Sequence, residues 1–188
     1  VVPYCDNLRF FPSYLQQLEM ESNGKSITLD GNEAPYNTAP ITWGGVGTAS
    51  QHAFFQLIHQ GTRMIPVDFI LPLHTGNFNQ ELEHYRVANC LAQSETLMLG
   101  NREKNTKPEK RLTGSRPSTT LMLENLSPRA LGALLSLYEH KTEALGFLWN
   151  INSFDQWGVE NGKNAATRIM QGLNSKDYSG HDQSTSSL

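Results

Sequence analysis

The carboxylate of Glu21 is the first side chain whose position suggests chemistry. It lies near the end of a predicted helix, Pro12 to Asn23, in which proline suits the first turn and Asn23-Gly24 supplies the stop. A carboxylate in the last helical turn faces the negative end of the helix dipole, which disfavours its charged form. Such a group suits a general base that works near neutral pH. The alternative is a solvated Glu21 whose partner is Lys25, four residues further on.

His52 is the second candidate. A glycine-rich turn (Gly44, Gly45 and Gly47) leads into a predicted helix that ends at Gly61. His52 falls in the first turn of that helix, where the positive end of the dipole favours a neutral imidazole. The alternative is an ordinary surface histidine.

The same predicted helix has two distinct faces. Its apolar residues share one stripe, which we expect to face a core: Ala53, Phe54, Leu57 and Ile58. His52, Gln56 and His59 lie on the opposite side, where they can meet solvent, a substrate or another chain.

Several common site types are not indicated by the sequence. His52 and His59 are two helical turns apart, roughly 10 Å, which is too far for one metal ion. His84, His140 and His181 show no ligand spacing, and the chain lacks a GxSxG elbow and a CxxC pair. The glycine-rich turn lacks the Lys-Ser/Thr of a phosphate loop. The two cysteines, Cys5 and Cys90, are expected to be buried or idle free thiols of a reducing cytosol.

Composition indicates a single globular domain. The chain has 188 residues, of which 38% are hydrophobic and 18% charged, with a net charge of −3. This charge argues against nucleic acid or an anionic membrane as the main partner. The sequence contains neither an apolar run of membrane-spanning length nor an N-terminal signal pattern. Because the chain opens with Val-Val-Pro, we expect it to be a fragment.

The order of predicted elements indicates an α/β fold. Strands are predicted at Pro40 to Trp43, Met64 to Leu73 and Thr119 to Leu123, and a short hairpin around Asp30-Gly31. Further helices are predicted from Gln80 to Leu99, from Ser127-Pro128 to about Glu143, and after a capping box at Ser153 and Gln156.

The strand at Met64 to Leu73 is apolar throughout, as expected of a strand buried on both faces. We therefore predict a parallel sheet in a three-layer α/β/α sandwich, with ligands beyond the carboxyl ends of its strands, where Trp43 stands. Phe154 and Trp157 are expected in the core. The domain is predicted to span 1–173, with a solvated basic excursion at 101–117, and the polar segment 174–188 is predicted to lead to a missing C-terminal helix.

Four strings resemble the phosphoglucose isomerase family. They are Met20 to Lys25 (MESNGK), Gly47 to Gly61, Met64 to Phe69, and Phe154 to Lys163 (FDQWGVENGK). The resemblance runs from about Tyr14 to Thr185, and the long motifs occur in the family's order.

This resemblance implies a sugar isomerase (SIS) domain of a cytoplasmic, homodimeric enzyme of glycolysis and gluconeogenesis. The implied reaction is the interconversion of glucose 6-phosphate and fructose 6-phosphate through a cis-enediol, without metal or organic cofactor. The family's base falls on Glu21. Its ring-opening histidine, shared across subunits, falls on His52, and a substrate-contacting glutamine falls on Gln17.

The sequence also departs from the family pattern. Gly45-Val46 and Ala49-Ser50 replace the usual pairs before His52, and Ser186-Ser187 stand where Asn or Gln and then Gly are usual. The family's phosphate-binding loop and arginine are expected before Val1, and its lysine after Leu188, so we expect the chain alone to be inactive. The alternative function is a non-catalytic SIS domain that binds a sugar phosphate as a regulatory signal.

Overall fold

The computed structural model describes residues 1–76, 79–101, 106–175 and 180–187. They form two compact units, Val1–Ser153 and Phe154–Leu188. The elements of the first unit are β1 (Val2–Pro3), η1 (Asp6–Leu8), α1 (Phe11–Leu15), η2 (Gln16–Glu21), α2 (Gly47–Ser50), α3 (Phe55–Gln60), β2 (Val67–His74), α4 (Gln80–Leu99), η3 (Pro108–Lys110), β3 (Ser118–Asn125) and α5 (Pro128–Leu148). The second unit contains α6 (Trp157–Ser175) and α7 (Gln183–Ser186).

A parallel sheet forms the centre of the first unit. The strand order is β1-β2-β3, with Val2 opposite Phe69 and Ile70 opposite Leu121. The predicted α/β class and parallel pairing are confirmed. The apolar run at 64–73 forms the central strand, although β2 begins only at Val67, where its pairing with Ser118 of β3 starts.

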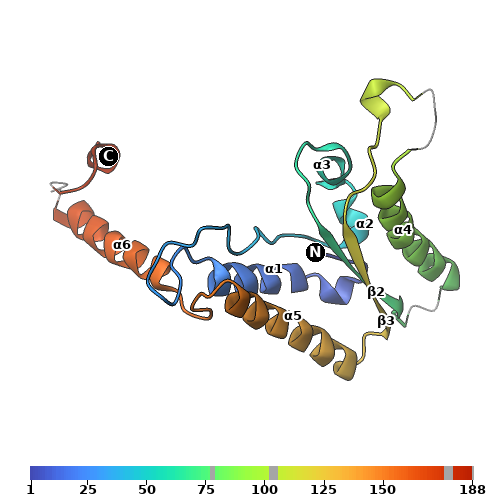
Figure 1. The fold of residues 1–188 in the computed structure, drawn as a ribbon, viewed down its shortest axis with the longest axis horizontal. Helices are drawn as coiled ribbons and strands as arrows, with labels where there is room; N and C mark the ends of the chain where they lie inside the picture. Colours follow the sequence, from blue (N-terminus) through green and yellow to red (C-terminus); the bar gives the residue numbers. More distant parts are fainter. Residues whose placement is uncertain (77–78, 102–105, 176–179, 188) are drawn as a thin grey trace. The chain divides into compact units, whose positions relative to one another are not determined.

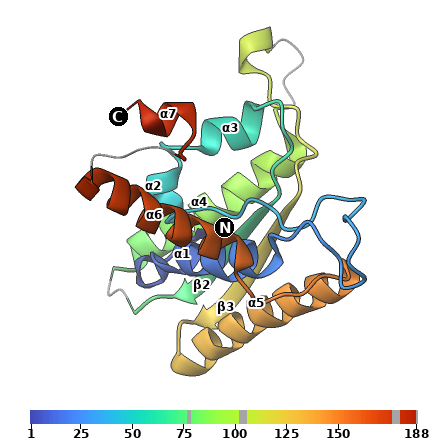
Figure 2. The ribbon, with the colours of Figure 1, turned by 90° about the vertical axis from the view of Figure 1, so that its left-hand side faces the viewer.

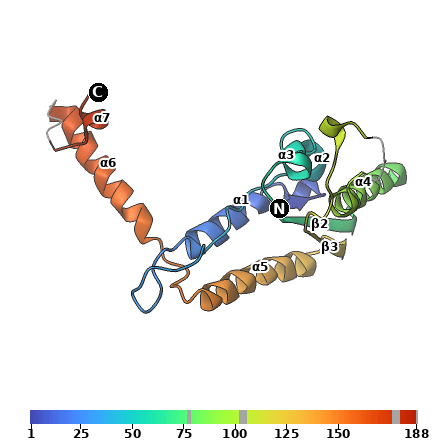
Figure 3. The ribbon, with the colours of Figure 1, turned by 45° about the horizontal axis from the view of Figure 1, so that its top comes forward.

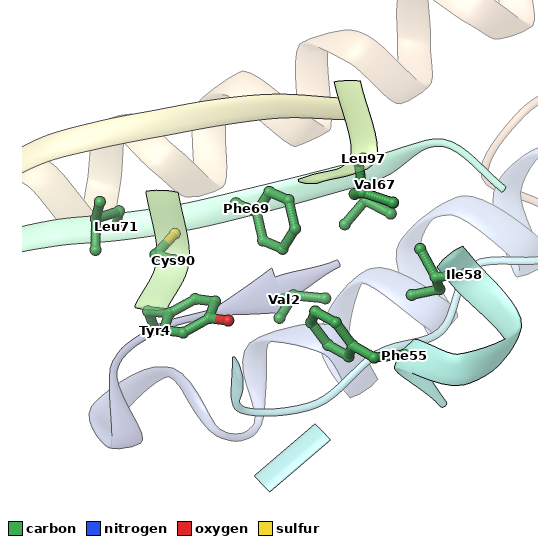
Figure 4. Packing of buried hydrophobic residues seen from close by; sticks show 9 residues of the cluster. All are labelled: Val2, Tyr4, Phe55, Ile58, Val67, Phe69, Leu71, Cys90 and Leu97. Atoms are coloured by element: carbon green, nitrogen blue, oxygen red, sulfur yellow. The ribbon is translucent and has the colours of Figure 1, made fainter. Parts of the chain in front are cut away.

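Helices lie on both sides of this sheet (Figure 1). Val67, Phe69 and Leu71 point to one side, where they pack with Phe55 and Ile58 of α3 and with Cys90 and Leu97 of α4 (Figure 4). Ile70 points to the other side and packs with residues of α1 and α5 such as Leu15, Leu134 and Tyr138. The helices α1 and α5 run side by side on that face (Figure 2, Figure 3). Alternate residues of β2 are therefore buried in two separate clusters, as expected for a strand covered on both faces.

The helices with strong end signals match their predictions. The α4 helix spans the predicted residues, with the Asn79 side chain accepting a hydrogen bond from the Leu82 amide and Gly100 at φ 63° beyond its end. The α5 helix begins at Pro128 with the Ser127 hydroxyl as its cap, but it continues past Glu143 to Leu148. Cys5 and Cys90 are buried free thiols, also as predicted.

The predicted strand at 40–43 is wrong. Residues 40–43 form no ladder with any described strand. The predicted hairpin is reduced to a turn at Gly31 (φ 79°) and an isolated bridge between Ile27 and Glu33.

The predicted continuous helix up to Gly61 is also interrupted. A turn at 51–54 separates α2 from α3, and Phe54 has the non-helical angles φ −141° and ψ −3°. This break shifts the helical phase, so that Phe55 and Ile58 are buried while Ala53 and Leu57 are exposed.

Two predictions about the start of the second unit are wrong. The Ser153 hydroxyl donates to Oδ1 of Asn23 rather than capping a helix. Phe154 and Trp157, which were expected in the core, are 59% and 68% exposed.

The basic excursion 101–117 is only partly described. Lys107, Lys110 and Arg111 are exposed, in agreement with a solvated segment. Arg102 and Lys104 lie outside the described residues. Among the described residues, no helix is both long and apolar enough to cross a membrane.

The central strand allows a test of the packing. Leu71→Ala should lower the free energy of unfolding by about 2–5 kcal/mol, because Leu71 is 0% exposed and its removal leaves a cavity. Leu73→Ala, on the same strand but 37% exposed, should cost about 1 kcal/mol or less. Urea unfolding followed by circular dichroism measures both. Equal losses at the two positions would contradict the described burial.

Candidate active site

Gln17 and Glu21 lie in an unusual helical turn. The segment Gln16–Glu21 is a π-helix that continues α1 without interruption. π-Helical turns are rare and occur frequently at functional sites. Both side chains are exposed, whereas Leu15 and Glu19 on the opposite side are buried. The turn thus presents a glutamine and a carboxylate outward, four residues apart along one face.

The chain directly after Glu21 is fixed by buried hydrogen bonds. Asn23 is 1% exposed. Its Nδ2 donates to the main-chain oxygen of Thr142 at 2.8 Å, and its Oδ1 accepts from Ser153. The Lys25 ammonium donates to the main-chain oxygens of Glu21 (2.7 Å) and Ser22 (2.8 Å), which caps the helix end.

An ion pair with a buried carboxylate, which was not among the predicted features, precedes Glu21. Glu19 is 3% exposed; its Oε1 lies 2.6 Å from the Lys141 ammonium, and its Oε2 accepts a hydrogen bond from Thr42. The signal was present, because Glu19 follows Leu15 by four residues and so continues the apolar stripe of the helix. A carboxylate on a buried stripe requires a partner.

The ion pair lines a cavity of about 260 Å³. Lys141 also lies over the Tyr138 ring, and the Tyr138 hydroxyl donates to Oδ2 of Asp68 at 3.0 Å. Burial raises the pKa of the Tyr138 phenol, and the negative charge of Asp68 raises it further.

The place of this cavity differs from the predicted ligand site. It adjoins Val67 and Asp68 at the amino end of β2, whereas the sequence predicts ligands at the carboxyl ends of strands. Gln17, Glu21 and His52 are not among its lining residues.

His52 lies in the turn between α2 and α3. It is exposed, and its main-chain N–H donates to Ala49 at 3.0 Å. The prediction that His52 lies in the first turn of a helix is therefore wrong, because the helix is interrupted at this residue. His59, also predicted on the outer face, is instead partly buried, with Nε2 2.8 Å from Oε1 of Gln93. Gln56 is exposed, as predicted.

The three predicted site residues are not joined to one another. Within the described parts of the chain, no hydrogen bond or ion pair links Gln17, Glu21 and His52. Nor does any group of three or more His, Cys, Asp or Glu side chains among those residues form a metal site.

Comparison with known proteins places the chain in a family. The model of the family described as phosphoglucose isomerase matches residues 1–188. The chain belongs to the phosphoglucose isomerase family. It is 48% identical over 200 residues to the glucose-6-phosphate isomerase of Cupriavidus metallidurans and 47% identical over 206 residues to that of Deinococcus deserti. Both alignments cover 100% of this chain, but 36% and 37% of those phosphoglucose isomerases.

Two solved structures are similar to this chain in fold. A glucose-6-phosphate isomerase from Chlamydia trachomatis matches with a TM-score of 0.83 and 45% identity, over 92% of this chain and 34% of that one. A hypothetical protein from Thermus thermophilus matches with a TM-score of 0.70 and 25% identity, over 90% of this chain and 40% of that one. The chain thus spans about a third of the length of the phosphoglucose isomerases that it matches.

The buried ion pair yields a stability prediction. Lys141→Met should lower the free energy of unfolding by about 2 kcal/mol, because it leaves the Glu19 carboxylate buried without its cation. The expected loss is below that of a fully buried pair because the Lys141 side chain is 40% exposed. Arg129→Met, at an exposed position of the same helix, should change stability by less than about 0.5 kcal/mol. Urea unfolding measures the free energy of unfolding of both variants. A Lys141→Met protein as stable as the wild type would show that the ion pair does not stabilise the fold.

Proposed function

We propose that this chain contributes catalytic residues to an aldose–ketose isomerase that interconverts glucose 6-phosphate and fructose 6-phosphate. Membership of the phosphoglucose isomerase family carries the proposal. Two of its named relatives are glucose-6-phosphate isomerases that align with the whole of this chain. The exposed Glu21 in a π-helical turn supports it, because a base must reach a bound substrate.

Glu21 acts in this proposal as the general base. Its carboxylate removes the proton from C2 of the open-chain aldose and returns it to C1, while a hydroxyl proton moves from O2 to O1 through the cis-enediol. Gln17, one helical turn earlier on the same exposed face, contacts the sugar. The chemistry requires no net oxidation, and the proposal includes no metal or organic cofactor.

His52 opens the sugar ring in the active site of a second subunit. Its exposure in the turn after α2 is compatible with this role, since a histidine that serves a neighbouring subunit must lie on the surface. The proposed enzyme is a homodimer in the cytoplasm, and neither nucleic acid nor a membrane is proposed as a partner.

The proposed architecture is an SIS-type α/β/α sandwich. Its basis is the parallel sheet of the first unit with helix clusters on both faces. The regulatory sugar-phosphate sensor, the alternative function, is not favoured, because the relatives named here are isomerases and a sensor needs no base at C2.

The role of Glu21 is tested by Glu21→Gln in the full-length enzyme. This change keeps the shape of the side chain but removes the basic lone pair, so turnover should fall by at least about 10³-fold. Exchange of the C2 hydrogen with solvent should be lost in parallel, while ring opening persists and a non-reacting sugar phosphate still binds. A coupled glucose-6-phosphate dehydrogenase assay and exchange in deuterated water measure these effects. If the variant exchanges the C2 hydrogen at nearly the wild-type rate, Glu21 is not the base but a solvated surface residue.

The sharing of His52 between subunits is tested with mixed dimers. Full-length His52→Ala and Glu21→Gln proteins should each be nearly inactive. Hybrid dimers should regain activity, because one of their sites combines the intact Glu21 of one subunit with the intact His52 of the other. If activity does not return although subunit exchange is demonstrated by mass labelling, the two residues act from the same chain.

A further inference from the structure

The residues two positions before and two positions after Glu21 are both tied to one turn of α5. Glu19 pairs with the Lys141 ammonium at 2.6 Å. Asn23 donates to the main-chain oxygen of the next residue, Thr142, at 2.8 Å. Glu21 lies between these attachments with its own side chain exposed. Its backbone is therefore held from both sides by the same helix.

The two residues that make these attachments are buried, although Lys141 itself is 40% exposed. Glu19 and Asn23 are 3% and 1% exposed. Each uses both ends of its polar group: Glu19 accepts from Lys141 and Thr42, and Asn23 donates to Thr142 while accepting from Ser153. Hydrogen bonds of this kind are strong where water is excluded, and a partner left unpaired is costly.

A glycine of α5 leaves room for the hydrogen bond between Ser153 and Asn23. A Cβ atom at Gly146 would overlap the Ser153 hydroxyl and crowd Oδ1 of Asn23. Earlier contacts join α1 and α5 along their length: the ring of Phe11 meets that of Tyr138 at 5.6 Å, and Tyr14 donates to Glu139 at 3.0 Å. The α5 helix thus contacts the segment 11–23 at several points along its length.

We propose that Glu19 and Asn23 are positioning residues. By tying the backbone on either side of Glu21 to α5, they set the distance and angle between the Glu21 carboxylate and the proton that it removes. This inference rests on the proposed function, in which Glu21 is the base. A general base must lie within hydrogen-bond reach of the proton that it removes. A displacement of about 1 Å can lower the rate by about 10²-fold. Because the Glu21 side chain is itself exposed, its placement depends on the backbone that carries it.

Two variants of the full-length enzyme test the proposal. Asn23→Ser shortens the side chain and removes its hydrogen bonds, and Lys141→Met removes the cation that holds Glu19. Each should lower kcat by about 10-fold to 10²-fold, with KM for fructose 6-phosphate changed by less than about threefold, because the phosphate is bound elsewhere. Exchange of the C2 hydrogen should fall by the same factor as kcat.

Conservative variants and a stability control separate positioning from folding. Lys141→Arg keeps the cation and should retain most of the wild-type kcat, and Ser153→Ala, which removes only one bond to Asn23, should give an intermediate loss. Leu71→Ala lies in the cluster on the other face of the sheet and should keep its kcat at a temperature where the enzyme stays folded. If Asn23→Ser or Lys141→Met does not fold, the two milder variants decide the question. The proposal then requires that kcat decrease from wild type to Lys141→Arg and further to Ser153→Ala.

The outcomes distinguish this inference from the proposed function. If Glu21→Gln abolishes turnover while Asn23→Ser, Lys141→Met and Ser153→Ala keep the wild-type kcat, positioning by α5 is wrong and the base assignment stands. If Glu21→Gln is itself active, the proposed function fails. A loss of kcat in Leu71→Ala as large as in Asn23→Ser would also overturn the inference, because general destabilisation would then explain it.

Discussion

The burial of β2 on both faces is the constraint on which the first unit depends. Phe69, Ile70 and Leu71 are fully buried although they are consecutive, so neighbouring side chains must enter different clusters. One cluster fixes α3 and α4 and the other fixes α1 and α5. Because α1 continues into η2, the same packing that orders the sheet also determines where the Gln17 and Glu21 face can lie.

Elements with local signals could be predicted from the sequence. The α4 helix has a capping asparagine and a terminal glycine, and β2 has an uninterrupted apolar run, so their types follow from neighbouring residues alone. The exposed positions of Gln17, Glu21 and His52 agree with accessible site residues. The roles proposed for them rest on the family motifs, since a carboxylate at a helix end has many uses.

Features that depend on distant partners could not be predicted. The burial of Glu19 is the clearest case, because its partner Lys141 is 122 residues away in the chain. The segment 40–43 shows the same limit: an apolar run becomes a strand only if a neighbouring strand is available to pair with it. Ser153 had the spacing of a helix cap, but Asn23 uses its hydroxyl.

The two cysteines lie in different layers of the first unit. Cys90 belongs to the cluster between β2 and α4, and Cys5 to the cluster on the α1 and α5 side. Burial raises the pKa of the Cys90 thiol to about 12, so both shielding and protonation slow its reaction with thiol reagents. Each face of the sheet thus carries one cysteine whose reaction with a thiol reagent reports the opening of that layer. Pulsed alkylation with identification of the labelled peptide would show whether the layer that supports Glu21 opens independently of the layer beneath α4.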